Sequence, residues 1–337
     1  VRQVYDTAVR LLSELGMGEV PERLKQDLLR GGATISGERI LFSKELVERA
    51  IKTAPKQFTL HGRDPSRSIH IGGDKVHFGT GGAAVQTLDL DTAQYRPSTL
   101  EDLHNFTRLQ DALRNVSWFT RCCVATDVPD NFDLDVNTVF ALLKNTTKPV
   151  ATSFTIAPHI APIVRMLDIA AGGEGEFAKR PFLKAHISPV ISPLRYAEDA
   201  IDVVYECIAH NIPMSCITAA QAGATAPATL AGILTQSLAE TLASLVMVQT
   251  ISKGFPMVFS NWPFVIDLRT GAFAGGSGET AVLNAASAQV SNWLDLPSGV
   301  ASSMTDAKAI DAQYGMEKGM TSIAAALSGG NLIYESS

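Results

Sequence analysis

Aromatic side chains recur in this sequence where apolar runs give way to loop-like segments. Phe154, Trp262 and Phe264 lie at or next to such points, and so do Trp118 and Phe119. An aromatic face attracts a quaternary ammonium group by a cation–π interaction, worth about 2 kcal/mol or more once the pair is desolvated. We expect Trp118 and Phe119 to pack in the core instead. Phe154, Trp262 and Phe264 therefore predict a binding site for a small cationic ligand.

Acid–base groups are scarce at the same points. His186 is the one histidine there, and the carboxylates of Asp267, Asp306 and Glu335 come from separate parts of the chain. No H-x-x-x-H pair and no G-x-S-x-G nucleophile motif occurs. His186 is either a base or a histidine of the pocket wall, and Glu335 is a candidate substrate contact. The pattern argues against a hydrolase and against a resident metal ion.

Further polar residues follow the apolar runs and could contact a substrate. Arg269 could hold a substrate carboxylate in a bidentate fork, or it could pair with Asp267 and brace its own loop. Gln221 and Asn261 are two more candidate substrate contacts. Lys184 lies inside an apolar run, where an inward-facing lysine could form a Schiff base. A lyase is therefore an alternative to a site that binds cations.

Eight short apolar runs, each but the last followed by a helical pattern, must position these residues. Strands that alternate with helices imply parallel pairing, and eight such units predict a closed (β/α)8 barrel. An open doubly wound sheet is the alternative, but no G-x-G-x-x-G follows the first run. In a barrel, functional residues gather at the carboxyl ends of the strands. The runs are 76–82, 116–124, 148–154, 181–190, 212–220, 255–262, 297–304 and 331–337.

The remaining segments divide the chain into an extension and a barrel. Residues 1–70 are predicted to form a helical extension with one short hairpin, and residues 71–337 the barrel, with a hairpin at 87–98 over one end. The apolar segment 230–250 contains Glu240 and several other polar residues. We interpret it as a buried helix capped by Thr225 rather than a membrane span.

Composition narrows the class of protein. The chain has 337 residues, 46% of them hydrophobic and 18% charged, which is typical of a globular protein. A net charge of −6 without a basic run argues against a nucleic-acid partner. The four cysteines form no C-x-x-C pair, which favours a reducing cytoplasm and gives no structural zinc site. The chain starts inside a helical pattern without an initiator Met, so we expect a fragment.

The stretch SGVASSMTDAK, residues 298–308, changes from small uncharged residues to TDAK within two positions. We expect the small residues to form the seventh strand, packed tightly in the barrel wall. TDAK should begin the next helix, with Thr305 or Asp306 as its N-cap. The change of character at Met304 and Thr305 would then face the mouth of the barrel.

Five stretches match a known family: 77–89, 223–232, 267–279, 305–318 and 326–336. Taken together, they resemble the trimethylamine methyltransferase superfamily, the corrinoid-dependent methylamine and betaine methyltransferases. The resemblance implies a (β/α)8 barrel, in agreement with the count of strands. Family members usually continue past the eighth strand, so it also implies that a C-terminal cap is missing here.

The resemblance bears on the stretch SGVASSMTDAK. In the trimethylamine enzymes a pyrrolysine precedes a segment like TDAK, and here Met304 or Thr305 holds that place. The chain therefore resembles the branch without pyrrolysine, which demethylates quaternary amines such as glycine betaine. The resemblance places Met304, Thr305 and Asp306 at the catalytic centre. The resemblance also implies that cobalamin is carried by a small corrinoid-binding partner and that no cofactor is held tightly by this chain; we expect a homo-oligomer.

The chemistry of such a reaction fits the scarcity of acids and bases. A quaternary ammonium group already carries its charge, so a methyl group can leave to a Co(I) nucleophile while a neutral tertiary amine departs. No general acid is required, and the barrel would mainly orient one N–methyl group. The alternative from another class is a catalytically silent barrel that binds betaine or regulates a partner.

Overall fold

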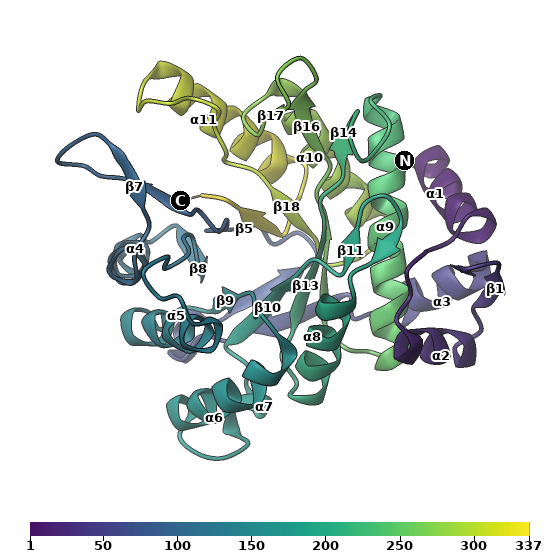
Figure 1. Ribbon diagram of the computed structural model, residues 1–337, viewed down its shortest axis with the longest axis horizontal. Helices are drawn as coiled ribbons and strands as arrows, with labels where there is room; N and C mark the ends of the chain where they lie inside the picture. Colours follow the sequence, from purple (N-terminus) through teal and green to yellow (C-terminus); the bar gives the residue numbers. More distant parts are fainter. Residues whose placement is uncertain (337) are drawn as a thin grey trace.

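The computed structural model describes residues 1–336 and shows a ring of helices around a barrel of parallel strands (Figure 1). Neighbouring strands follow the chain from β5 through β8, β9, β10, β13 and β15, and β18 pairs with β19, which returns to β5. Between β15 and β18, Phe259 pairs with Ser298, and the Phe259 N–H donates to Pro297 O over 2.7 Å. The predicted (β/α)8 barrel is confirmed, and the open sheet is excluded.

The eight predicted apolar runs all contain a barrel strand. These strands are β5 (His77–Gly79), β8 (Val116–Thr120), β9 (Val150–Thr152), β10 (Leu183–Ile187), β13 (Met214–Thr218), β15 (Met257–Asn261), β18 (Gly299–Ala301) and β19 (Leu332–Tyr334). The outer helices are α4 (Leu100–Ala112), α5 (Asn131–Asn145), α6 (Ile160–Ala171), α8 (Glu198–Ala209), α9 (Leu230–Ile251), α10 (Gly278–Trp293) and α11 (Ala312–Leu327). Along each strand, side chains alternate between the barrel interior and the layer of helices, as the two-residue period of a strand requires.

Loops at the carboxyl ends of the strands add short elements around the mouth. They are β6 (Gln86–Leu88), β7 (Tyr95–Pro97), η2 (Ala157–His159), β11 (Val190–Ile191), β12 (Arg195–Tyr196), β14 (Gln221–Ala222), β16 (Phe264–Asp267) and β17 (Ala272–Phe273). The short helix α7 (Glu176–Lys179) precedes β10. These additions extend the mouth beyond the strands themselves, so the site is built on both strands and loops.

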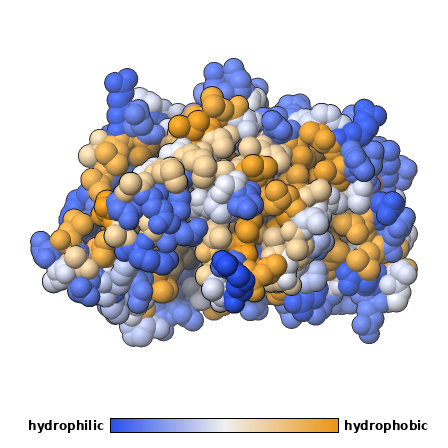
Figure 2. Space-filling view, turned by 90° about the horizontal axis from the view of Figure 1, so that it is seen from above, coloured by the Kyte–Doolittle hydropathy of each residue, from blue (hydrophilic) through white to orange (hydrophobic). Residues whose placement is uncertain are grey.

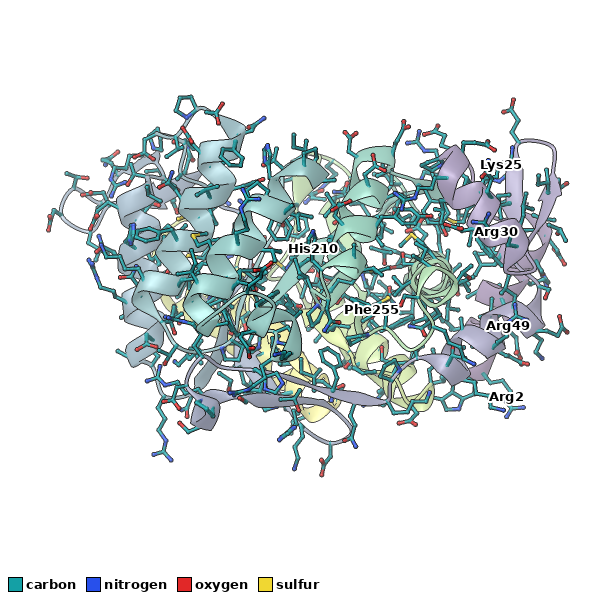
Figure 3. All side chains as sticks on the ribbon, turned by 90° about the horizontal axis from the view of Figure 1, so that it is seen from below. Arg2, Lys25, Arg30, Arg49, His210 and Phe255 are labelled. Carbon is teal, nitrogen blue, oxygen red and sulfur yellow. The ribbon has the colours of Figure 1, made fainter. Side chains whose placement is uncertain are left out.

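The N-terminal extension packs on one side of the barrel, against α9 (Figure 1). It contains α1 (Arg2–Glu14), α2 (Glu22–Arg30), the predicted hairpin β1 (Thr34–Ser36) and β2 (Arg39–Leu41), and α3 (Lys44–Thr53). The Ser43 side chain accepts from the Leu46 N–H and so caps α3. Lys25, Arg30 and Arg49 lie along the outer edge of the extension, away from the barrel (Figure 3).

A second hairpin closes the amino end of the barrel. It consists of β3 (Gln57–Leu60) and β4 (Ile69–Gly72), joined through η1 (Pro65–Arg67). Its apolar side chains Leu60 and Ile71 belong to the same buried cluster as interior residues of the barrel such as Trp118. The His61 N–H donates to Pro181 O, a residue that precedes β10. This end of the barrel is therefore filled, and the predicted boundary at residue 70 falls inside β4.

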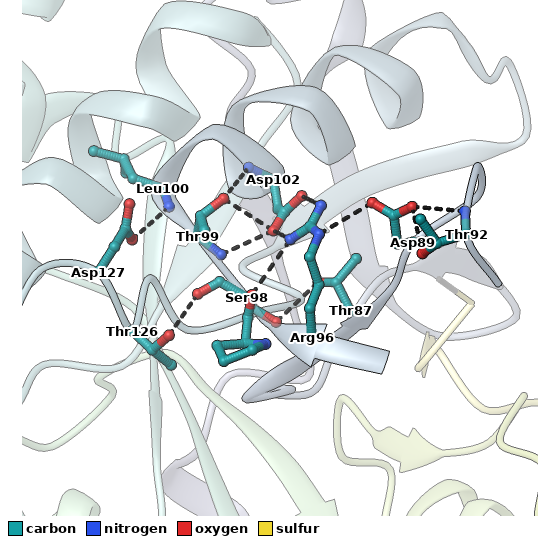
Figure 4. A network of polar contacts seen from close by, with 11 residues as sticks. Thr87, Asp89, Thr92, Arg96, Ser98, Thr99, Leu100, Asp102, Thr126 and Asp127 are labelled. Carbon is teal, nitrogen blue, oxygen red and sulfur yellow. Dashed lines mark hydrogen bonds and ion pairs between the residues drawn. The ribbon is translucent and has the colours of Figure 1, made fainter. Parts of the chain in front are cut away.

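The hairpin of β6 and β7, predicted at 87–98, is anchored by one arginine (Figure 4). The Arg96 guanidinium donates to both carboxylate oxygens of Asp102, over 2.6 and 2.8 Å, and to Asp89 over 3.2 Å. Asp102 also forms a capping box with Thr99 at the start of α4. These contacts hold the hairpin on the first helix of the barrel, while Leu90 at its tip is 87% exposed.

The predicted cap of α9 is wrong by one turn. The helix begins at Leu230, and the Thr229 side chain accepts from the Gly232 N–H over 3.2 Å. The Thr225 hydroxyl instead accepts from the Gln221 N–H over 3.0 Å, because residues 221–226 form a tight turn around β14. Among residues 1–336, α9 alone is long and apolar enough to cross a membrane, and 89% of that window is buried inside the protein. It is a core helix here.

The prediction that TDAK begins a helix is also wrong. Helix α11 begins at Ala312, and its N-cap is Asp311, whose side chain accepts from the Tyr314 N–H. Residues 302–311 form a loop instead. The side chains of Thr305 and Asp306 bond to other segments of the mouth, so neither caps a helix. The change of character in SGVASSMTDAK marks the passage from strand to loop.

Candidate active site

Aromatic rings fill the upper part of the barrel interior, at the carboxyl ends of the strands. The ring centroids of His186 and Trp262 are 5.4 Å apart, and His186 lies at the same distance from Tyr334. Trp262 stands 4.9 Å from Tyr334 and 6.2 Å from Phe264, edge to face in both cases. Phe264 in turn contacts Phe273 on β17 at 4.9 Å. The rings form a ladder from the core to the surface of the mouth.

Trp262 is buried, although it was predicted to lie in a loop. Its exposed fraction is 6%, and its indole N–H donates to Gly299 O over 2.9 Å. Trp262 therefore forms the floor of the mouth, while half-buried Phe264 and exposed Phe273 form its side. Trp118 and Phe119 are buried in the core, as predicted.

Lys184 lies two residues closer to the amino end of β10 than His186. Its ammonium nitrogen donates to the Tyr334 hydroxyl over 2.8 Å and lies 5.0 Å from the centroid of the Trp118 ring. Burial lowers the pKa of Lys184 to about 7. The side chain is fully buried under the aromatic floor. A carbonyl substrate has no route to it, so the lyase alternative loses its support.

His186 faces the mouth as a neutral imidazole. Burial, together with the charges of Lys184 and Arg121, holds its pKa well below the usual range. Its Nδ1 is buried and has no hydrogen-bond partner among the described residues. A histidine that resists protonation this strongly is a weak base. The structure favours a wall histidine with one polar atom left for a ligand or a water molecule.

Two more strand ends carry buried hydroxyl groups without a partner in the described chain. They belong to Thr120 at the end of β8 and to Ser302 just after β18. Buried polar atoms in native proteins are nearly always hydrogen-bonded, to protein or to bound molecules. Together with His186 Nδ1, these atoms mark the carboxyl ends of the strands as the polar part of the site.

Glu335 closes the mouth between β19 and β5. Burial raises the pKa of its carboxyl group to about 7, against the smaller opposing effects of the Lys318 charge and the Gly82 backbone N–H. A Cβ atom on Gly81 would lie 2.4 Å from Glu335 Oε1, so the carboxylate packs directly against this glycine. Glu335 and Ser303 both adopt a left-handed φ, 68° and 61°. Such strained residues are frequent at functional sites.

The loop after β18 contains the three residues that were predicted to be catalytic. The Thr305 hydroxyl and the Asp306 N–H both donate to Glu317 on α11, each over 2.7 Å. The Asp306 carboxylate accepts from the Gly275 and Gly276 N–H groups over 3.0 and 3.1 Å. These side chains therefore position the loop.

Met304 is the member of the three that lies among the aromatic rings. It is half-buried and packs against the cluster that contains Trp262. A Cβ atom on Gly275 would come within 3.1 Å of the Met304 Cβ, so the methionine lies tightly against that glycine. Met304 shapes the pocket rather than supplying a reactive group.

The remaining predicted substrate contacts fall in different places. Phe154 and His186 line a cavity of about 350 Å³ at the ends of β9 and β10. Gln221 lies on β14 opposite Phe264 on β16, at the mouth. Asn261 turns outward, where it accepts a hydrogen bond from Ser237 on α9, and is 1% exposed. Its inclusion in the site was wrong, because the alternation along β15 directs its side chain away from the barrel axis.

Arg269 takes the second of its two predicted roles. Its guanidinium bonds to both carboxylate oxygens of Asp267, over 3.2 and 3.1 Å, and its side chain is 88% exposed. It braces the loop between β16 and β17. The prediction missed Arg121, which follows β8 directly and is half-buried at the mouth. A single charged residue at the end of the apolar run VSWFT was the available signal.

No group of three or more His, Cys, Asp or Glu side chains that could hold a metal ion occurs within residues 1–336. The four cysteines are buried and unpaired by disulfides. The thiols of Cys122 and Cys123 share a hydrogen bond, which raises the pKa of Cys122 and lowers that of Cys123. The chemistry of the mouth is that of aromatic faces, hydroxyl groups and a few charged side chains.

Known proteins resemble the chain along its whole length. The family model described as trimethylamine methyltransferase (MTTB) matches residues 1–337. A glycine betaine methyltransferase of Desulfitobacterium hafniense strain Y51 is 30% identical over 334 residues, which are 99% of this chain and 69% of the relative. A trimethylamine methyltransferase of Methanosarcina barkeri strain Fusaro is 30% identical over 340 residues, with coverage of 99% and 68%.

Among solved structures, a dihydropteroate synthase from Coxiella burnetii in complex with pteroic acid aligns with a TM-score of 0.49 and 12% identity, over 82% of this chain and 92% of that one. A score at this level says nothing about the reaction. The full-length family match and the two relatives decide the assignment: the chain belongs to the trimethylamine methyltransferase family.

Proposed function

We propose that this chain transfers a methyl group from a quaternary or tertiary methylamine, such as glycine betaine, to the Co(I) centre of a corrinoid carried by a small partner protein. The observation that supports it most strongly is the ladder of rings formed by Trp262, Phe264 and Phe273 at the mouth. The names of the relatives point to the same class of reaction.

From a quaternary amine, the transfer balances without a proton. The bond between nitrogen and one methyl carbon breaks, and its electron pair stays on nitrogen, which leaves as a neutral tertiary amine. The corrinoid, when its carrier is docked, supplies the two-electron nucleophile. A neutral His186 is consistent with this chemistry, because the nitrogen needs no proton and a cationic imidazole would repel the ammonium group.

The residues of this chain hold and orient the substrate. Trp262 and Phe264 offer ring faces to the ammonium group, and an ionised Glu335 adds a negative charge at the end of β19. Met304 limits the volume next to the rings. The Asp306 carboxylate, through the Gly275 and Gly276 N–H groups, fixes the loop that carries Met304. Such orientation is what converts binding into a near-attack geometry.

The rim of the mouth suits a docking partner. Leu268 and Phe273, on either side of the turn between β16 and β17, are 62% and 43% exposed. These apolar side chains offer a surface on which a corrinoid or its carrier could rest. We also propose a homo-oligomer, because hydrophobic side chains spread over the side of the molecule that carries α10 and α11 (Figure 2). The four free cysteines support a location in the reducing cytoplasm. On α11, the hydrophobic side chains of Met316, Ile323 and Leu327 are exposed.

The decisive experiment follows the tertiary amine product. Purified chain is mixed with glycine betaine and a corrinoid protein reduced to Co(I), and dimethylglycine is measured by mass spectrometry together with the change in the corrinoid spectrum. Stoichiometric appearance of both signals is the expected result. Binding of glycine betaine without either signal, with several corrinoid proteins and several quaternary amines, would leave the betaine-binding barrel as the function.

A further inference from the structure

Two arginines lie near the mouth, and only one of them is already paired. Arg269 is bonded to Asp267 and is exposed. Arg121 is half-buried, and its guanidinium makes no hydrogen bond or ion pair with any residue of 1–336, apart from longer-range electrostatic effects. A charge that is withdrawn from water without a partner is costly, so such a group is expected to meet one in the working protein.

The strand register places Arg121 at the level of the site. Thr120 pairs with Ala151 on β9, and Ala151 pairs with Lys184 on β10. Thr120 and Lys184 therefore lie at one level of the barrel. Arg121 lies one residue further toward the carboxyl ends of the strands, and His186 lies two residues further. The strands β8 and β10 flank β9 at about 5 Å each, so about 10 Å separates the two backbones that carry Arg121 and His186. The Arg121 charge acts on His186, which agrees with this placement.

The one carboxylate near Arg121 is already occupied. Asp135 on α5 accepts from the Thr155 N–H and hydroxyl over 2.8 Å each, and from His159 Nδ1 over 2.7 Å. These contacts tie Asp135 to the loop after β9. The remaining acidic neighbour is the thiol of Cys123. Arg121 consequently lacks a committed counter-ion in the chain.

Two unpartnered polar atoms share this corner of the mouth. Thr120 Oγ1 adjoins Arg121 in sequence, and His186 Nδ1 lies across β9. A guanidinium, a hydroxyl and an imidazole nitrogen can together surround a carboxylate, which accepts up to four hydrogen bonds. On its other side, the His186 ring is 5.4 Å from Trp262. The corner formed by Arg121 and Thr120 and the aromatic floor formed by Trp262 therefore both adjoin His186.

We propose that Arg121 binds the carboxylate of a zwitterionic substrate and thereby selects betaines over methylamines that lack an acid group. The ammonium end lies against Trp262 and Phe264, and the carboxylate end against Arg121 and Thr120. The inference rests on the proposed function for its substrate class. From the sequence, Arg269 was the candidate for binding the carboxylate. Arg121 takes that role here, because Arg269 is already paired with Asp267.

Binding measurements without any corrinoid test this assignment directly. Isothermal calorimetry compares glycine betaine with choline and with tetramethylammonium, two cations that lack a carboxylate. The wild-type protein should bind glycine betaine at least tenfold more tightly than choline. Arg121→Gln should remove that preference by weakening glycine betaine alone, and Arg121→Lys should restore part of it, because lysine keeps the charge without the fork.

Arg269→Gln is the matched control, since it removes the other arginine near the mouth. It should leave both affinities unchanged. Thermal unfolding and circular dichroism verify that each variant is folded, and the comparison of ligands on the wild-type protein needs no variant at all. Equal affinities for glycine betaine and choline on the wild type, or an equal loss of both in Arg121→Gln, would overturn the assignment.

The binding test and the transfer assay separate the two proposals. Betaine binding that depends on Arg121, without methyl transfer to any corrinoid protein, would refute the proposed reaction and keep the carboxylate site. Methyl transfer that proceeds equally well from choline and from glycine betaine would keep the reaction and refute the site.

Discussion

Lys184 donates a hydrogen bond of 2.8 Å to the hydroxyl of Tyr334 inside the barrel, and the same hydroxyl lies 2.7 Å from the Ser215 hydroxyl. The two large polar side chains come from β10 and β19, on opposite sides of the barrel. This polar centre is sealed by the hairpin of β3 and β4 below and by the aromatic floor above. It is a structural element whose charge state depends on pH.

The first prediction concerns stability and Lys184. Its pKa is about 7 in the folded protein and 10.5 in its ordinary state, so between these values the unfolded chain binds more protons. The free energy of unfolding should therefore rise with pH across this window, by at most about 5 kcal/mol in total. Lys184→Met should remove this rise and be at least as stable as the wild type at pH 7.

Urea titrations at pH 7.0, 8.0 and 9.0 measure the effect as the difference between the two proteins. The difference removes the contributions of all other titrating groups. Parallel stability curves for wild type and Lys184→Met would show that Lys184 is protonated in the fold at all three values.

The second prediction concerns Glu335 and the pH dependence of cation binding. Its pKa of about 7 means that the carboxyl group is neutral at pH 6 and ionised at pH 8. Affinity for tetramethylammonium should therefore increase as pH rises through 7, because an ionised carboxylate attracts the cation. Glu335→Gln should flatten this dependence and hold the affinity near its value at low pH.

Lys184 loses its charge over the same range and would shift affinity in the same direction. Lys184→Met is therefore measured in parallel, and the double variant completes the cycle. A pH dependence that survives in Glu335→Gln but vanishes in Lys184→Met would assign the effect to the lysine.

The third prediction separates charge from shape at the aromatic rings. The wild type should bind glycine betaine more tightly than 3,3-dimethylbutanoate, in which carbon replaces the charged nitrogen. Phe264→Leu should weaken glycine betaine by about 1 kcal/mol and leave the neutral isostere almost unchanged, because only the cation gains from the ring face. Phe264 is preferred to Trp262, whose removal would also cost about 3–5 kcal/mol of core packing.

Phe140→Leu is the control for this test, since Phe140 is 47% exposed on α5, away from the aromatic rings. Calorimetry on each of the three proteins with each of the two ligands gives the answer. If the wild type binds the charged ligand and its isostere equally well, the rings serve packing alone.

The fourth prediction concerns Met304 and substrate size. Met304→Ala enlarges the pocket without removing a hydrogen bond, so the ratio of kcat/KM for bulkier betaines to that for glycine betaine should rise several-fold. Met316→Ala, on the exposed side of α11, should leave the ratio unchanged. An unaltered ratio in Met304→Ala would place the substrate away from this loop.

The sequence was sufficient to predict the order of the elements. Alternating apolar runs and helical patterns predicted eight parallel strands, and each run contains a barrel strand because burial on both faces requires a continuous apolar segment. The cap of α9 was predicted wrongly as Thr225, because a second threonine, Thr229, stands one turn later and only the path of the chain decides between them.

The site followed from the sequence only in part. That Trp262 and Phe264 lie at the mouth could be inferred from their place after a strand. The sequence did not show which arginine is left without a partner. Arg269 pairs with Asp267, its neighbour in the chain, whereas the surroundings of Arg121 come from the distant segments β9, β10 and α5. Pairing between distant segments is a property of the folded chain.

The residue types thus determined a (β/α)8 barrel with aromatic strand ends and few acids or bases, since apolar periodicity and local composition act over a few residues. Tertiary structure alone decided that Asn261 faces α9, that Thr305 and Asp306 latch a loop, and that Lys184 is sealed in the core. Each of these depends on which side of a strand faces the barrel axis and on which distant group meets it there. These contacts exist only in the closed barrel, in which β19 pairs with β5.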